Sequence, residues 1–113
     1  MIRFDGYYIF EPVLYQERKE HPPNYLNMAY SFNKNGIVRY TNKWSTEKSE
    51  ILFTEKDFND NSDKNCYKIN GQEIYFIDNC KKNEYKFFYD IISENEIKYR
   101  ESGDIMKFVP WKK

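Results

Sequence analysis

The chain has 113 residues and a mass of 13.9 kDa, which is room for one domain. Lysine and arginine number 18 and are balanced by 18 aspartates and glutamates, so the net charge of zero argues against nucleic acid or a membrane surface as the partner. One alanine and three leucines stand against eleven tyrosines, eleven isoleucines and nine phenylalanines, and this composition favours strands over helices. We therefore expect a single all-β domain over residues 1–113.

Short runs of alternating apolar and polar residues, separated by turn residues, predict the strands in chain order. We expect strands at residues 6–15, 25–33, 37–43, 66–70, 72–78, 84–92, 96–101 and 104–110, with a weaker run at 50–53. Residues 16–24 and 43–50 are polar connections. Thr54 to Asp57 has the pattern of a helix cap and predicts a single helical turn.

The FNKNGIV hairpin has two registers, and the apolar pattern chooses between them. A type I turn with Gly36 as the bulge residue pairs Phe32 with Val38 and Tyr30 with Tyr40. A slip of one residue would scatter these side chains over both faces. The pattern therefore predicts the bulged turn and one continuous inward face.

The C-terminal hairpins follow the same reasoning. A three-residue loop with Asn95 in the left-handed conformation pairs Ile91 with Ile97. A turn at Gly103 then pairs Ile97 with Phe108, which continues the inward face into the last strand.

The central hairpin decides what the two cysteines do. A two-residue turn at Asn70 and Gly71 places Cys66 opposite Tyr75, and Cys80 about five residues or roughly 16 Å further along the strand. A disulfide needs Cα atoms within about 7 Å of each other. We therefore expect two free thiols, unless the chain doubles back after the strand.

Free thiols fit a reducing compartment. No apolar run approaches the roughly 18 residues that span a bilayer, and the N-terminal residues lack a basic region followed by an apolar stretch. We expect a cytoplasmic protein with no membrane segment. The alternative is an exported protein whose leader has been removed.

Eight or nine consecutive strands linked by hairpins form an antiparallel up-and-down meander. Closure of so long a meander into a barrel removes its exposed edges. We therefore predict a small barrel, with a two-sheet β-sandwich as the alternative.

The opening FDGYY, the aromatic-NKNG-apolar hairpin and the final KFVPW together resemble small bacterial lipocalin-like (calycin-type) barrels. Those families often begin with Gly-x-Trp on the first strand, and Gly6-Tyr7-Tyr8 stands there in this chain, with Tyr8 in place of the Trp. The resemblance implies a barrel interior that holds a ligand.

Nothing in the chain has the pattern of a catalytic, metal or cofactor site. His21 is the single histidine, and it lies in the loop EHPPN without a recognisable nucleophile motif nearby. One histidine and two separated cysteines fall short of a metal-ligand set. Asp57, Asp60 and Asp63 lack the spacing of a calcium loop. We therefore expect a non-enzymatic protein without a cofactor or metal.

The tyrosines on the predicted inward face are the candidate ligand-binding residues: Tyr8, Tyr30, Tyr40, Tyr67, Tyr85, Tyr89 and Tyr99. A buried phenol needs a hydrogen-bond partner, and a small amphipathic or aromatic ligand in a partly hydrated cavity above about 300 Å³ would supply one. The alternatives are that the hydroxyls reach the barrel rims or that AT-rich coding tolerates tyrosine where phenylalanine would serve.

The outward face offers a second candidate site. A protein-interface hypothesis rests on Tyr75, Phe88, Ile92 and Trp111, with Ile77, Ile105 and Val109 beside them. An exposed apolar patch of this kind marks a protein partner, such as the target of an inhibitor or immunity-type protein, or a second copy in a homodimer. In a sandwich this face would pack against the second sheet instead.

Overall fold

The computed structural model describes residues 2–15, 24–48, 51–60, 64–81 and 86–111. Nine strands and one short α-helix, α1 (Glu55–Asn59), lie in these ranges, with a 3₁₀ turn, η1 (Asp78–Cys80). The strands are β1 (Gly6–Phe10), β2 (Val13–Tyr15), β3 (Asn24–Phe32), β4 (Ile37–Ser45), β5 (Lys64–Asn70), β6 (Glu73–Ile77), β7 (Lys86–Ser93), β8 (Glu96–Tyr99) and β9 (Ile105–Pro110).

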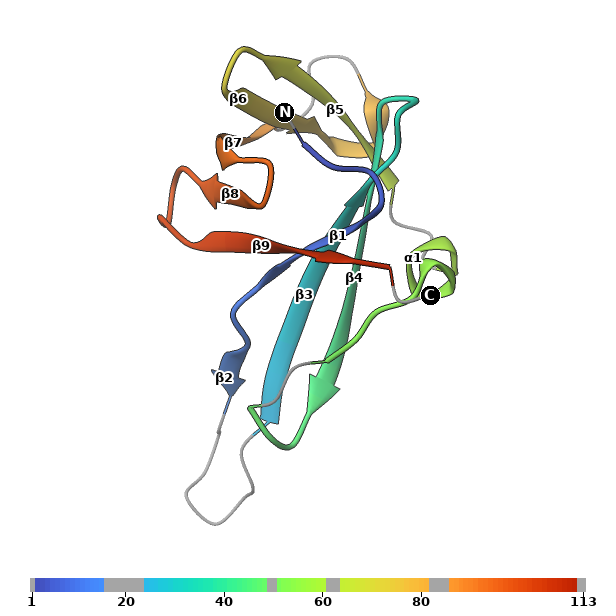
Figure 1. Ribbon diagram of the computed structural model, residues 1–113, viewed down its shortest axis with the longest axis vertical. Helices are drawn as coiled ribbons and strands as arrows, with labels where there is room; N and C mark the ends of the chain where they lie inside the picture. Colours follow the sequence, from blue (N-terminus) through green and yellow to red (C-terminus); the bar gives the residue numbers. More distant parts are fainter. Residues whose placement is uncertain (1, 16–23, 49–50, 61–63, 82–85, 112–113) are drawn as a thin grey trace.

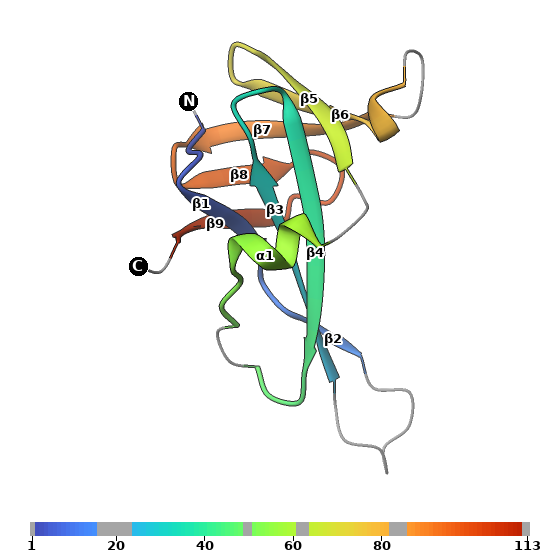
Figure 2. The same ribbon diagram turned by 90° about the vertical axis from the view of Figure 1, so that its right-hand side faces the viewer.

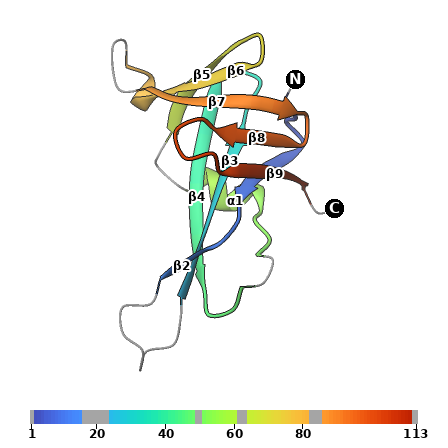
Figure 3. The same cartoon turned by 90° about the vertical axis from the view of Figure 1, so that its left-hand side faces the viewer.

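The sheet is an antiparallel meander that closes on itself. Each strand from β3 to β9 pairs with the next strand in sequence, and β1 pairs with both β9 and β3. The result is an eight-stranded barrel, with β7, β8 and β9 side by side in Figure 3. β2 pairs with the start of β3, so β2 and the adjoining halves of β3 and β4 extend beyond the barrel (Figure 1). The predicted all-β meander and barrel are confirmed, and the sandwich alternative is excluded.

The predicted pairing of the NKNG hairpin is right. Phe32 pairs with Val38 and Tyr30 with Tyr40, as the bulged NKNG turn requires. Gly36 has a φ of 88°, which is a conformation that glycine adopts without strain.

The C-terminal hairpins depart from prediction in detail. Ile91 pairs with Ile97 as expected, but the extra residue is accommodated as a bulge between Ile91 and Ser93. The predicted left-handed Asn95 is therefore wrong: positive φ values outside glycine occur, in the described part of the chain, at Asn79 and Cys80. Ile97 pairs with Met106 rather than Phe108, because the turn is longer by two residues. A shift of two preserves which face each side chain occupies.

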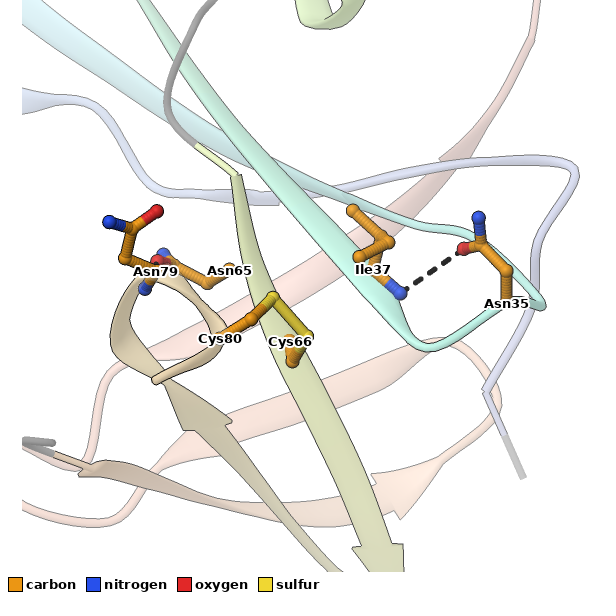
Figure 4. The surroundings of a disulfide bond; sticks show 6 residues. All are labelled: Asn35, Ile37, Asn65, Cys66, Asn79 and Cys80. Carbon is orange, nitrogen blue, oxygen red and sulfur yellow. Dashed lines mark hydrogen bonds between the residues drawn. A yellow bond between two sulfur atoms is a disulfide. The ribbon is translucent and has the colours of Figure 1, made fainter. Parts of the chain in front are cut away.

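The two cysteines form a disulfide, so the prediction of free thiols is wrong. The hairpin turns at Gly71, and Cys66 pairs with Ile77 rather than Tyr75. η1 then doubles the chain back through two left-handed residues, Asn79 and Cys80, with φ of 52° and 58°. The Cα atoms of Cys66 and Cys80 lie 4.8 Å apart, and the two sulfur atoms are bonded (Figure 4).

A polar contact fixes the turn that carries Cys80. The side-chain Oδ1 of Asn65 accepts a hydrogen bond of 2.7 Å from the backbone N–H of Asn79. Asn65 immediately precedes Cys66, so this bond and the disulfide hold the turn against β5 at neighbouring positions (Figure 4). Strand spacing could not predict the reversal, because it depends on the left-handed backbone conformation of two consecutive residues, Asn79 and Cys80.

The barrel interior holds the main core, made by the predicted inward face. Its buried members are Ile2, Tyr8, Phe32, Val38, Tyr67, Ile74, Phe76, Tyr89, Ile91, Ile97 and Met106, with Phe4, Phe10, Tyr30, Tyr99 and Phe108 packed against them. Burial of so many large apolar side chains supplies the main driving force for folding.

A second core lies outside the barrel, between the sheet and the segment 51–59, which we call the strap. Tyr7 and Ala29 on the outer face pack against Phe53 and Phe58 of the strap, with Ile9, Ile51, Val109 and Trp111 around them. The strap residues 51–53 form no strand, so that weaker prediction is wrong. α1 begins at a capping box formed by Thr54 and Asp57, which confirms the predicted helical turn. Figure 2 shows α1 lying across the outer side of β3 and β4.

Candidate ligand-binding cleft

A cleft of about 810 Å³ lies where the end of β1 pairs with the start of β9, beside the start of the strap. It is lined by Ile9, Phe10, Glu11, Pro12, Val13, Asn27, Lys48, Ile51, Gly103, Asp104, Ile105 and Lys107. These residues come from β1, the β1–β2 connection, the start of β2, β3, the strap and the segment before it, and the β8–β9 turn with the start of β9.

The lining combines an apolar wall with a charged rim. Ile9, Ile51 and Ile105 supply apolar surface, while two cations and two carboxylates stand among the lining residues. Lys48 Nζ lies 2.8 Å from Glu11 Oε1, so the segment before the strap and the β1–β2 connection are joined across the rim. The hydrogen bond and the charge of Lys48 hold the pKa of Glu11 below its usual value.

Asn27 is the buried polar residue of the cleft. Its side chain is fully buried, and the Nδ2 group donates to the backbone carbonyl of Lys43 and to Oγ of Ser45, both at 3.1 Å. A longer bond of 3.4 Å reaches the carbonyl of Tyr25. Oδ1 of Asn27 has no hydrogen-bond partner among the described residues. A buried carbonyl oxygen without a donor costs about 1–3 kcal/mol, so this atom is a feature that needs a reason.

Two of the predicted tyrosines reach partners at the barrel ends. The hydroxyl of Tyr8 donates to the carbonyl of Glu94 at 2.6 Å and accepts from the backbone N–H of Arg3 at 2.9 Å. The hydroxyl of Tyr67 donates to the carbonyl of Asn33 at 2.6 Å. Burial raises the pKa of both phenols, which therefore stay neutral hydrogen-bond donors.

The other candidate tyrosines that the structure describes also have partners within the protein. Tyr30 and Tyr89 share a hydrogen bond, and burial raises the pKa of each. Tyr40 accepts from Asn42 at 3.0 Å, and the hydroxyl of Tyr99 donates to a carboxylate at 2.8 Å. Tyr85 lies outside the described residues. The buried phenols thus find the partners that the ligand hypothesis expected a small molecule to supply.

The rings of these tyrosines fill the space between them. The ring centroid of Tyr30 lies 5.1 Å from that of Tyr40 and 5.2 Å from that of Phe76. Phe76 stacks on Tyr89 at 4.5 Å, and Tyr89 contacts Tyr99 at 5.0 Å. This is the edge-and-face packing of an aromatic core. The cleft described above is lined by none of these tyrosines.

The outward candidates separate into two places. Tyr75 and Phe88 are cross-strand neighbours on β6 and β7 with ring centroids 5.8 Å apart, and Ile92 lies four residues further along β7. Phe88 is 38% exposed and Ile92 51% exposed. Trp111 lies elsewhere, because its ring packs 5.5 Å from Tyr7 in the second core. The predicted site residues therefore do not form one patch.

Sequence reasoning missed the cleft and a further exposed group. On the part of the sheet that extends beyond the barrel, Tyr15 and Trp44 have ring centroids 5.4 Å apart and are both about half exposed. Asn27 has the pattern of a polar, outward residue of a strand, and nothing in its local pattern indicates that its side chain is fully buried. Pairings between distant segments create both features, so a local signal does not predict them.

No protein-family model matches this chain, and comparisons with curated proteins and with solved structures give no significant match. The closed, all-antiparallel barrel agrees with the lipocalin-like resemblance at the level of architecture. No helix in the described ranges has the length and apolar character needed to cross a membrane.

Proposed function

We propose that this protein is a non-enzymatic binding protein that holds a small amphipathic molecule in the cleft beside Asn27. The observation that carries the proposal is the cleft itself, whose volume of about 810 Å³ falls in the range of small-molecule sites. Apolar walls with a few polar groups are the usual composition of such sites. A relationship to bacterial lipocalin-like binding proteins belongs to the same proposal, and the barrel architecture supports it.

The cleft is a better candidate than the tyrosine-lined interior. A ligand in the interior would have to displace aromatic rings that contact one another, and break the hydrogen bond between Tyr30 and Tyr89. A ligand in the cleft would instead cover apolar surface that water now touches, such as Ile105, which is 39% exposed. Covering exposed apolar surface favours binding.

Two matched substitutions test the proposal. We would titrate the fluorescent apolar amine N-phenyl-1-naphthylamine into the wild type, Ile105→Glu and Ile69→Glu. Ile69 is 43% exposed and lies on β5 away from the cleft, so it matches Ile105 in residue type and exposure. A carboxylate in the cleft wall should weaken probe binding by about tenfold or more, because the charge must be desolvated.

Ile69→Glu should bind like the wild type. Equal affinities for all three proteins would rule out the cleft, and equal losses in both variants would indicate a general effect on folding. Far-ultraviolet circular dichroism of each variant shows whether the barrel is retained.

A second candidate function is a protein partner, bound through the β6–β7 face. The exposed rings of Phe88 and its neighbour Tyr75 support it, and Arg100 lies over Phe88 at 5.6 Å. Aromatic residues beside arginine are typical of binding hot spots. If this function holds, the native mass of the protein purified from its own source includes a second polypeptide or a second copy. Phe88→Ser with Ile92→Ser should then remove that mass, and Ile69→Ser should retain it.

The disulfide supports a place of action outside reducing compartments. Disulfides persist in oxidising environments and are rare in the cytoplasm. The expectation of a cytoplasmic protein rested on free thiols, and Cys66 and Cys80 are bonded. We therefore propose that the protein works in an oxidising compartment. Rapid alkylation of the protein in its own source tests this, since a protein from a reducing compartment would gain two alkyl groups without prior reduction.

A further inference from the structure

We propose that a second, smaller pocket, between α1 and the outer face of β3 and β4, binds a free α-amino acid with a small side chain. The guanidinium of Arg39 holds the carboxylate of the amino acid, and the carboxylate of Glu55 holds its ammonium group. The pocket has a volume of about 140 Å³. It shares no lining residue with the larger cleft, so its ligand does not depend on the function proposed for that cleft.

The pocket lies beside α1, which crosses the outer face of the sheet (Figure 2). Its polar lining comes from Ser31 of β3, from Arg39 of β4, and from Glu55 and Asn59 of α1, with Asn33 just after the end of β3. Ser31 and Arg39 are cross-strand partners, so their side chains stand next to each other on one face of the sheet. A hydroxyl group and a guanidinium group are thus placed together under α1.

Ser31 is the buried polar residue of this pocket, with 6% of its surface exposed. Its hydroxyl makes no hydrogen bond to another residue in the described ranges. In those ranges, Oδ1 of Asn27 is the unpartnered polar side-chain atom that is sealed from solvent. Oγ of Ser31 is therefore accessible, and the pocket is where Ser31 meets solvent. A hydroxyl in this position is available to donate a hydrogen bond to a ligand oxygen.

Arg39 and Glu55 bring opposite charges to the same pocket without pairing with each other. Neither side chain forms an ion pair or a hydrogen bond within the part of the chain that the structure describes. The planar guanidinium of an arginine matches a carboxylate with two parallel N–H donors, which gives orientation as well as affinity. A ligand with one negative and one positive group can bridge the two side chains.

Charge and size together select the class of ligand. Phosphate, with a multiple negative charge, would gain one cation but would also meet the carboxylate of Glu55. A zwitterion satisfies both charged side chains. The volume of about 140 Å³ is well below the roughly 300–1,000 Å³ of sites for drug-sized ligands, so only a few heavy atoms fit. Small α-amino acids meet both conditions, because they carry the two charged groups on one carbon.

The apolar part of the lining suits the side chain of such a ligand. Phe58 and Trp111 both line the pocket, and their ring centroids lie 5.7 Å apart. The methyl group of alanine is small enough to lie against these rings while the charged groups face Arg39 and Glu55. Covering aromatic surface adds a modest favourable contribution to binding.

Three compounds that differ by one group each test the assignment. L-alanine carries both charged groups, propionate lacks the ammonium group, and ethylamine lacks the carboxylate. The ¹⁵N-labelled protein is titrated with each compound and with inorganic phosphate, and the side-chain Nε–H signal of Arg39 and the indole N–H signal of Trp111 are followed. We expect L-alanine to shift both signals to saturation, with a dissociation constant about tenfold lower than that of propionate. Ethylamine and phosphate should bind more weakly than L-alanine.

Two variants assign the binding to the two charges, with the Trp111 signal as the readout. Glu55→Gln removes the partner of the ammonium group and should make L-alanine bind no better than propionate. Arg39→Gln should weaken the binding of both compounds about tenfold or more. If Arg39→Gln does not fold, Arg39→Lys takes its place, since it keeps the charge but loses the paired donors. Arg100→Gln is the matched control, because the ion pairs of Arg100 lie on β6 and β7 outside the pocket, and it should bind like the wild type.

Equal affinities for L-alanine and propionate in the wild type would overturn the assignment of an amino acid. Tighter binding of phosphate than of L-alanine would also overturn it and would indicate a site for anions alone. Signals that do not saturate with L-alanine, or a loss in Arg100→Gln as large as that in Arg39→Gln, would remove the site itself. None of these results bears on the larger cleft, because the compounds are not amphiphiles and the two signals come from residues outside it.

Discussion

Removal of the disulfide should destabilise the protein by an amount that the closed loop sets. Cys66 and Cys80 are separated by 14 positions, and a bridge closing a loop of about 15 residues contributes about 3 kcal/mol, chiefly by restricting the unfolded chain. For a domain of this length, such a loss lowers the melting temperature by about 12 °C. The double variant Cys66→Ser/Cys80→Ser should still fold, because β5 and β6 remain paired and the barrel core lies elsewhere.

Urea unfolding measures this difference directly. The wild type, the double serine variant and the wild type held under a reductant are compared by tryptophan fluorescence and circular dichroism. The reduced wild type is the matched control, and it should unfold together with the double variant. A difference below about 0.5 kcal/mol between oxidised wild type and variant would refute the loop-closure argument. Two thiols that alkylate in the unreduced, unfolded wild type would refute the disulfide itself.

Three further changes follow from single contacts. Gly6→Ala should destabilise the barrel by about 1–3 kcal/mol in urea unfolding, because a Cβ there would collide with the backbone of Val109; an unchanged midpoint would mean that β1 and β9 can separate. Thr54→Ala should cost about 1 kcal/mol through the lost cap of α1, with Thr54→Ser retaining most of it as the control. The pKa of Asp90 is held low by its hydrogen bond and charge pairing with Arg100, so the stabilisation from Asp90 is present above its unfolded pKa and is lost as the pH falls through the lower folded value. Carbon-detected NMR titration of Arg100→Gln should return the Asp90 pKa toward the ordinary value, and an unmoved pKa would show that the ion pair does not act on it.

The apolar alternation predicted the barrel interior, because an error of two residues in strand pairing leaves each side chain on the same face of the sheet. Ile97 was assigned the wrong partner, Phe108 instead of Met106, yet it occupies the predicted inward face. An error of two residues in the pairing of β5 with β6 contributed to the wrong prediction of free cysteines. Pairing Cys66 with Tyr75 instead of Ile77 made the predicted distance between Cys66 and Cys80 too long by two residues. The reversal of the chain at η1, which the strand pattern does not indicate, closes the remaining distance between the two cysteines.

The outer face was harder to predict because its burial depends on a segment without regular pattern. Trp111 and Val109 alternate as outward residues, and they do point outward, but the strap covers them with Phe53 and Phe58. The strap residue Ile51 also lines the cleft. The alternation of apolar and polar residues around Asn27 carries no sign that its side chain is buried with an unpartnered oxygen.

An NMR titration of the ¹⁵N-labelled protein with 1-decanol tests the central claim most directly. Ligand binding in the cleft predicts that the amide signals of Ile9, Ile51 and Ile105 and the side-chain amide of Asn27 shift together and saturate. Shifts centred on the core tyrosines, or on Phe88 and Ile92, would contradict the account and place the site in the interior or on the β6–β7 face. A spectrum that does not change would contradict ligand binding by this class of molecule altogether.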